Sequence, residues 1–294
     1  MESAVKTDLS QLKMALGVYN SFSKALNTDE VYQELVDRLL EELDYKLEAK
    51  HLQLYGLIFK GRDDIHVPQA INELSTSRLL TMNWLDGKKL SEQTNRPQEE
   101  RNKLAELMFY SWYYPFYEYG IIHGDPHLGN YTFTDDLNVN LLDFGCIRRF
   151  RGEFIQGVLD LYHAQLNNDR EKAIHAYEQW GFTNLSKELI EVLNMWANFL
   201  YNPLLEDKVR RIDAHHDQAY GREMASKVHT ELHRVGGVTP PREFVMMDRA
   251  AVGMGSVFMH LSAECNWHQM YEGLIKNFNA IEVNKRQHQI ADKC

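Results

Sequence analysis

The feature that most constrains the fold of this chain is a pair of short motifs separated by a predicted hairpin. HGDPHLGN occupies residues 123–130, and DFG occupies residues 143–145. Between them, residues 131–134 and 139–142 are predicted to form two strands joined by the polar turn DDLN. A hairpin returns the chain close to the point where it left, so we expect the two motifs to lie side by side.

The two motifs supply oxygen atoms at fixed intervals. Asp125 and Asn130 lie five positions apart in the first motif, and Asp143 begins the second. Mg²⁺ prefers oxygen ligands and usually takes few of them from protein, with phosphates and water supplying the rest. The order HxDxxxxN and then DFG is typical of kinase-type phosphoryl transfer, in which the first Asp orients the attacking group. We interpret His123 as a packed structural residue and not as a base.

Hydrophobic spacing predicts helices on both sides of these motifs. Apolar residues recur at every fourth position over residues 31–54, which predicts a helix that is broken by the sequence GRDD. Two strands are expected at 65–71 and 79–85, followed by a helix at 98–118. From Glu153 onward the pattern is almost entirely helical.

This order of elements indicates an α+β protein with a protein-kinase-like fold. The strand signals lie in the first half of the chain, and the second half is a helical block. The turn that ends at Gly87 is the predicted domain boundary. Residues 1–87 would form a partial N-lobe, and residues 88–294 would form a helical C-lobe that carries the catalytic and metal loops.

Composition narrows the possible functions. The net charge is −10, and a broad nucleic-acid surface needs an excess of Lys and Arg, so we expect no nucleic-acid partner. The cysteines Cys146, Cys265 and Cys294 form no CxxC pair, which favours a reducing compartment. Residues 1–20 contain no apolar core of a signal peptide, and no apolar run is long enough to cross a membrane.

Taken together, the motifs resemble those of the UbiB/AarF-type atypical kinase-like family. Besides HGDPHLGN and LLDFG, the resemblance includes ELDYKLEA at 42–49, LLTMNWLDG at 79–87 and a tail segment at 240–267. It extends over nearly the whole chain. The resemblance implies a kinase-like fold, ATP and Mg²⁺ as cofactors, and ATPase or phosphotransferase activity that supports ubiquinone biosynthesis.

The resemblance also assigns roles to individual residues. Asp125 matches the family's catalytic aspartate, and Asn130 and Asp143 match its Mg²⁺ ligands. Glu42 matches the helix glutamate that pairs with a nucleotide-binding lysine, and Asp44 completes a Glu-x-Asp element that occupies or restricts the site.

A further nucleotide contact is expected from the segment LLTMNW. In the family this segment leads toward the hinge that holds adenine. The backbone from Asn83 to Leu85 is therefore a predicted nucleotide contact.

Two departures from the kinase pattern affect which substrate we expect and whether we expect the kinase-like domain to be complete. No APE motif follows DFG, and a helix is predicted within about ten residues of Gly145. This favours a small or lipid-like acceptor, or simple ATP hydrolysis, over a protein substrate.

The family's KxGQ motif, phosphate loop and strand lysine are not found in the sequence. Lys6 is not assigned the role of that lysine, because TDLSQL resembles the family segment that lies downstream of the lysine. We therefore expect the chain to be N-terminally incomplete.

Two other functions remain open from the sequence. A small-molecule phosphotransferase of the aminoglycoside or choline type also uses HGDxHxxN, although ELDY and DFG favour the first interpretation. A nucleotide-binding pseudoenzyme or scaffold is supported by the missing lysine. The expected partners are a nucleotide and, by resemblance, quinone-lipid intermediates or a biosynthetic complex. The implied location is the cytoplasm, at the periphery of the inner membrane in a bacterium, or the mitochondrion in a eukaryote.

Overall fold

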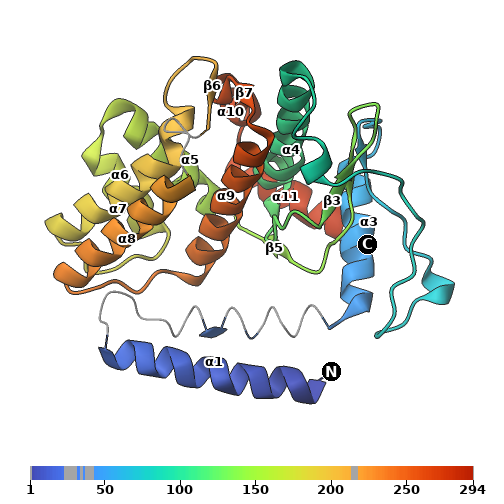
Figure 1. Ribbon diagram of the computed structural model, residues 1–294. Helices are drawn as coiled ribbons and strands as arrows, with labels where there is room; N and C mark the ends of the chain where they lie inside the picture. Colours follow the sequence, from blue (N-terminus) through green and yellow to red (C-terminus); the bar gives the residue numbers. More distant parts are fainter. Residues whose placement is uncertain (1, 23–31, 34–35, 37–42, 213–217, 294) are drawn as a thin grey trace. The chain divides into compact units, whose positions relative to one another are not determined.

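The computed structural model describes residues 2–22, 32–33, 36, 43–212 and 218–293 (Figure 1). Its α-helices are α1 (Glu2–Phe22), α3 (Tyr45–Ile58), α4 (Gln98–Tyr119), α5 (Gly152–Asn167), α6 (Arg170–Gln179), α7 (Lys187–Tyr201), α8 (Gln218–Arg234), α9 (Arg242–Leu261), α10 (Trp267–Ile275) and α11 (Ala280–Ala291). The strands are β1 (Ile65–His66), β2 (Ile121–His123), β3 (Tyr131–Phe133), β4 (Val139–Leu141), β5 (Ile147–Arg149), β6 (Arg210–Arg211) and β7 (Glu264–Cys265). Three 3₁₀ helices are η1 (Asn72–Leu74), η2 (Leu90–Glu92) and η3 (Asn202–Leu204). Helices combined with small sheets confirm the predicted α+β class.

The chain forms two compact units. The first comprises residues 1–40, 157–202 and 215–246, and the second comprises residues 41–156, 203–214 and 247–294. Both sequence motifs belong to the second unit. The predicted lobes, 1–87 and 88–294, do not correspond to these two units, so the lobe boundary at Gly87 stays a prediction.

Packed helices build the described part of the first unit. Helices α7 and α8 lie side by side (Figure 1). Two buried tyrosines of this unit have hydrogen-bond partners: Tyr177 donates its hydroxyl to Asn194 Oδ1 at 2.9 Å, and Tyr201 donates to the carbonyl oxygen of Val158 at 3.0 Å. These bonds satisfy polar groups that would otherwise be costly to bury.

Two nested strand pairs organise the second unit. Strand β2 pairs antiparallel with β5, with His123 opposite Ile147. Inside this pair, β3 pairs antiparallel with β4, with Tyr131 opposite Leu141. The loop from β2 to β3 and the loop from β4 to β5 therefore emerge at the same end of the strands. Strand β1 joins the inner pair by parallel pairing with β4.

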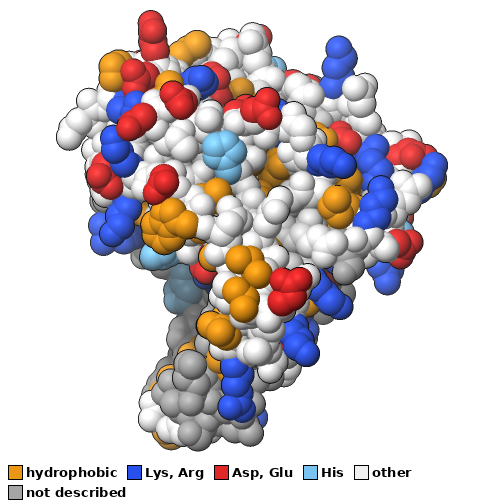
Figure 2. Space-filling model, turned by 90° about the vertical axis from the view of Figure 1, so that its right-hand side faces the viewer, with side chains coloured by type: hydrophobic (Ala, Val, Ile, Leu, Met, Phe, Trp, Pro, Cys, Tyr) orange, Lys and Arg blue, Asp and Glu red, His pale blue; other side chains and the backbone are white. Residues whose placement is uncertain are grey.

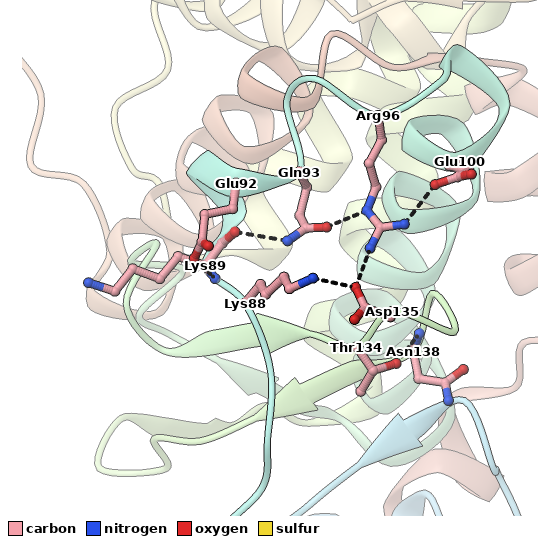
Figure 3. Close-up of polar contacts among 9 residues, drawn as sticks. All are labelled: Lys88, Lys89, Glu92, Gln93, Arg96, Glu100, Thr134, Asp135 and Asn138. Carbon is pink, nitrogen blue, oxygen red and sulfur yellow. Dashed lines mark hydrogen bonds and ion pairs between the residues drawn. The ribbon is translucent and has the colours of Figure 1, made fainter.

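The hairpin between the motifs is confirmed, and a polar network fixes its turn (Figure 3). Asp135 in the turn accepts bonds from Lys88 Nζ at 2.6 Å and Arg96 Nη2 at 3.2 Å. Arg96 also donates to Gln93 Oε1 at 2.6 Å and to Glu100 Oε2 at 2.7 Å. The turn is thus tied to the segment that leads into α4, and this restrains the connection between the two motifs.

Aromatic side chains form the core beneath the motifs. Phe144 of DFG is fully buried, and its ring centroid lies 4.9 Å from that of Tyr55 on α3. Trp112 on α4 packs against His123 at 5.0 Å and Tyr131 at 5.8 Å, and it donates its indole N–H to the His123 carbonyl oxygen at 3.0 Å. Helices α3 and α4 therefore support the strand ends that carry both loops.

The strands predicted at 65–71 and 79–85 are largely wrong. Only Ile65–His66 forms a strand, and 79–85 takes part in isolated bridges between Ala70 and Met82 and between Thr76 and Leu79. Regular pairing is not sustained because Pro68 lacks a backbone N–H and the 79–85 segment is mostly exposed.

The helix predicted over 31–54 is interrupted at 43–44 and extends further than expected at its C-terminal end. Tyr32, Gln33 and Val36 are helical, and the rest of 31–42 lies outside the described residues. Helix α3 begins at Tyr45, because the Asp44 side chain caps it, and continues to Ile58. The break expected at GRDD is confirmed, as are the helix at 98–118 and the helical second half. The two-residue strands β6 and β7 were not predicted. None of the helices in the described ranges combines the length and apolarity needed to cross a bilayer.

Candidate active site

Two adjacent loops form the candidate site. Residues 124–130 connect β2 to β3, and residues 142–146 connect β4 to β5. The loops are joined by backbone hydrogen bonds at both ends: Gly124 N donates to Cys146 O at 2.7 Å, and Leu142 N donates to Asn130 O at 2.9 Å. The predicted juxtaposition of the two motifs is therefore present.

His123 joins the two loops through its imidazole ring. Its Nδ1 accepts the backbone N–H of Asp125 at 3.1 Å, so Nε2 carries the proton and donates to the Asp143 carbonyl oxygen at 2.5 Å. The ring is buried among Trp112 and Phe144. With both nitrogens engaged by backbone, His123 has the structural role predicted for it.

Asp125 is held at both carboxylate oxygens. Asn130 Nδ2 donates to Asp125 Oδ2 at 3.1 Å and to its carbonyl oxygen at 3.1 Å. On the other side, Arg249 Nη2 donates to Asp125 Oδ1 at 2.9 Å. The Asp125 side chain is 30% exposed, so it remains accessible from solvent. A carboxylate has about four lone-pair positions, so Asp125 can accept a further hydrogen bond, for example from the hydroxyl group of a bound molecule.

Asn130 and Asp143 offer donors that suit a hard divalent cation. The amide nitrogen of Asn130 points at Asp125, and its Oδ1 has no hydrogen-bond partner among the described residues. Asp143 Oδ1 accepts the Gly145 N–H at 3.0 Å, and within the described ranges its Oδ2 has no partner. Each residue thus offers one oxygen that no described residue engages. The described residues contain no group of three or more His, Cys, Asp or Glu side chains arranged as metal ligands, and Mg²⁺ usually completes its shell with phosphate and water.

Helix α3 contacts the backbone of the DFG loop. His51 Nδ1 donates to the Phe144 carbonyl oxygen at 2.9 Å, and the Phe144 N–H donates to Glu48 Oε1 at 3.4 Å. Burial lowers the pKa of His51 below its ordinary value, and the positive charges of Arg149 and Arg148 lower it further. A neutral His51 can then act as a fixed donor to the loop.

The other predicted site residues are not joined to these loops by the described contacts. Asp44 accepts the backbone N–H groups of Lys46 at 3.1 Å and Leu47 at 3.3 Å, so its observed role is to cap α3. Glu42 lies outside the described residues. Asn83 Oδ1 accepts the Gln69 N–H at 2.5 Å within the exposed segment before Gly87.

That segment carries an exposed hydrophobic surface. Leu85 is half-buried, whereas Trp84 is 83% exposed and donates its indole N–H to Asp86 at 2.7 Å. Leu74, Leu79 and Met82 are exposed as well. Figure 2 views the molecule from the α3 side and shows hydrophobic side chains between charged ones. The nucleotide contact expected at Asn83 and Leu85 stays a prediction.

Sequence reasoning missed three residues that contact the loops. His51 continues the four-residue apolar spacing through Leu43 and Leu47, and this signal could have placed it on the buried face of α3. By its position in the sequence, Glu48 cannot be distinguished from a residue on a solvated helix face. Arg249 lies 124 positions from Asp125, and no local pattern connects the two.

An open cavity of about 490 Å³ lies elsewhere in the second unit, between α4 and α10. None of its lining residues belongs to the two loops. Two of its charged lining residues pair with each other: Arg62 forms two bonds to Asp64, at 2.7 and 2.6 Å, and stacks over the Tyr110 ring at 4.3 Å. We therefore place the candidate site at the loops and not in this cavity.

Known proteins are similar to this chain in sequence and in fold. A sequence model of the ABC1 atypical kinase-like domain family matches residues 1–177. A chloroplastic aarF domain-containing protein kinase of Arabidopsis thaliana, named as uncharacterised, is 31% identical over 171 residues, or 58% of this chain and 24% of that protein. The mitochondrial atypical kinase coq-8 of Caenorhabditis elegans is 23% identical over 290 residues, or 95% of this chain and 38% of that protein.

The chain spans less than half the length of these curated relatives. Among solved structures, the Rv3197–erythromycin complex from Mycobacterium tuberculosis is similar with a TM-score of 0.64 and 21% identity. The match covers 92% of this chain and 68% of the other. At this identity the likeness concerns the fold alone.

Proposed function

The chain belongs to the ABC1 atypical kinase-like domain family, and from this premise we propose that it binds Mg²⁺–ATP at the two loops and hydrolyses it or transfers its phosphoryl group. The observation that carries the proposal is the nested strand pairing. It brings an aspartate, an asparagine and a second aspartate to one end of the strands, in the order that kinase-type phosphoryl transfer uses.

Each residue has a distinct role in this proposal. Asp125 orients the attacking hydroxyl or water through a carboxylate whose Oδ2 accepts a bond from Asn130. Asn130 Oδ1 and Asp143 Oδ2 hold Mg²⁺, which neutralises charge on the nucleotide phosphates. His123 keeps the two loops in register, and His51 and Glu48 restrain the backbone of the metal loop.

The wider biological role rests on the family resemblance. We infer that the activity supports ubiquinone biosynthesis and that the acceptor, where one is used, is a small or lipid-like molecule. No APE motif follows DFG in the sequence. Instead, β5 leads directly into α5, which begins at Gly152. The exposed hydrophobic segment around Trp84 supports contact with a lipid intermediate or a partner protein.

Nucleotide-dependent stabilisation tests the metal site. We expect Mg²⁺–ATP at 100 times its Kd to raise the unfolding free energy by about 2.7 kcal/mol, read as an increase in Tm. Asp143→Asn should abolish the increase because it weakens the cation ligand. Asp136→Asn is the matched control, since it makes the same change at an exposed position of the hairpin turn. Equal stabilisation of both variants would contradict the assignment of Asp143.

Measurements of ADP release distinguish the proposed enzyme from the two alternative functions. Asp125→Asn should retain the nucleotide-dependent Tm increase and lose ADP release by at least about 100-fold, because it keeps the metal ligands and removes the orienting carboxylate. A nucleotide-binding scaffold predicts stabilisation without any ADP release from the unmodified protein. A choline- or aminoglycoside-type phosphotransferase predicts ADP release that requires the corresponding small molecule.

A further inference from the structure

Helix α9 reaches the proposed catalytic loop at two points. Arg249 forms the ion pair with Asp125 at 2.9 Å. One turn further along the same face of the helix, Gly253 lies against Pro126, the residue that follows Asp125. A Cβ built at Gly253 would collide with Pro126 Cγ and come within 3.2 Å of its Cβ. The helix can therefore approach this closely only because position 253 has no side chain.

This approach is what brings the arginine within reach. Residues four apart on a helix lie on one face, so contact at Gly253 sets the distance of Arg249 from the same loop. The Arg249 side chain is 46% exposed and donates to one oxygen of Asp125, while Asn130 donates to the other. The carboxylate is consequently fixed from two directions, by its own loop and by a helix distant in sequence.

We propose that Arg249 is a positioning residue for the phosphoryl-transfer reaction and that Gly253 is the contact that allows it to act. The inference rests on the proposed function of Asp125. Asn130 alone leaves Asp125 free to swing about its single held oxygen. Arg249 removes that freedom and leaves lone pairs for the attacking hydroxyl or water. Because Arg249 acts on the orienting carboxylate and not on the metal ligands, its loss should affect turnover more than nucleotide binding.

Kinetics of two Arg249 variants test this separation. Arg249→Gln should lower kcat for ADP release by about tenfold or more, since small misplacements of a catalytic group have effects of this size, while KM for Mg²⁺–ATP stays within about twofold. Arg249→Lys should recover part of the loss, because a lysine can still donate to one carboxylate oxygen. Unchanged kcat in Arg249→Gln, or an equal change in KM for ATP, would overturn the proposal.

Two glycine variants test the geometry without changing a charge. Gly253→Ala should reproduce the kcat defect of Arg249→Gln, because the added Cβ forces α9 away from Pro126. Gly255→Ala is the matched control: a Cβ at position 255 meets nothing within 4 Å, so kcat should be unchanged. Equal kcat in the two alanine variants would remove the role assigned to Gly253.

A double-mutant cycle, measured by thermal unfolding without nucleotide, distinguishes failure of this inference from failure of the proposed function. Single and double variants of Asp125→Asn and Arg249→Gln should give non-additive Tm changes, because the two side chains contact each other. Additive changes would show that the ion pair is not formed, and the inference would fall while the nucleotide site stands. Coupled changes in a protein without any ADP release would overturn the proposed function, and the positioning role with it.

Discussion

At the scale of single residues, the DFG loop at 143–145 is held by contacts to its backbone. The carbonyl oxygen of Phe144 accepts from His51, and its N–H donates to Glu48, both on α3. The Phe144 side chain is buried against Tyr55 of the same helix. One helix therefore fixes both the backbone and the side chain of the residue after Asp143, which restrains the direction of the carboxylate proposed to bind the metal.

His51 makes this contact sensitive to pH. Its pKa in the folded protein lies below the ordinary value of 6.5, chiefly because of burial, so the unfolded state binds more protons at mildly acidic pH. Stability from His51 is present above about pH 6.5 and decreases as the pH falls below it. We expect Tm to fall between pH 7.5 and 5.5, and His51→Gln to reduce this fall while keeping a donor for Phe144.

The control for this prediction is His288→Gln, which removes an exposed histidine on α11. Thermal unfolding is followed at both pH values for all three proteins. If His51→Gln and His288→Gln changed the pH dependence of Tm equally, burial of His51 would not be the cause.

At the scale of secondary structure, the start of α3 depends on one side chain. Apolar spacing runs unbroken through Leu43 and Leu47, so it predicts no helix boundary between them. Asp44 creates the boundary, because its carboxylate accepts the N–H groups of Lys46 and Leu47 and its own backbone is not helical. Periodicity reports the buried face of a helix, whereas capping decides where the helix begins.

Capping by Asp44 can be separated from the nucleotide contact that the family resemblance predicts. Asp44→Ala should lower the unfolding free energy by about 1 kcal/mol, and Asp44→Asn should lower it much less, since asparagine also caps helices. Asp169→Ala, which removes the equivalent cap of α6, is the matched control. Urea unfolding gives the energies, and a fall in Mg²⁺–ATP affinity in Asp44→Asn alone would identify the carboxylate as a nucleotide contact.

At the scale of the second compact unit, α11 connects the end of α4 with the end of β5. Gln287 Nε2 donates to the carbonyl oxygens of Tyr119, Gly120 and Phe150 at 3.0, 3.1 and 3.0 Å. Gly120 has φ of 65°, a conformation that favours glycine, and it ends α4 just before β2. The strand that leads into the proposed catalytic loop is thus anchored by α11, which lies beside α4 (Figure 1).

A charge at position 287 should break this anchor. Gln287→Glu replaces the donating amide with a carboxylate facing three carbonyl oxygens, so we expect a loss of about 1–3 kcal/mol in unfolding free energy. Gln289→Glu makes the same change at an exposed position of α11 and should have little effect. Urea unfolding of both variants measures the difference, and equal losses would show that the three carbonyl contacts do not stabilise the unit.

The sequence by itself determined the α+β class, the hairpin and the side-by-side loops, because these depend on contacts between residues close along the chain. It also indicated Asp125, Asn130 and Asp143 as candidate site residues, because they are close together along the chain. Only the tertiary structure decided that Arg249 pairs with Asp125 and that Gln287 anchors β2, since these contacts join residues 124 or more positions apart. It also decided that 79–85 forms no strand, because strand formation needs a partner that local propensity cannot supply.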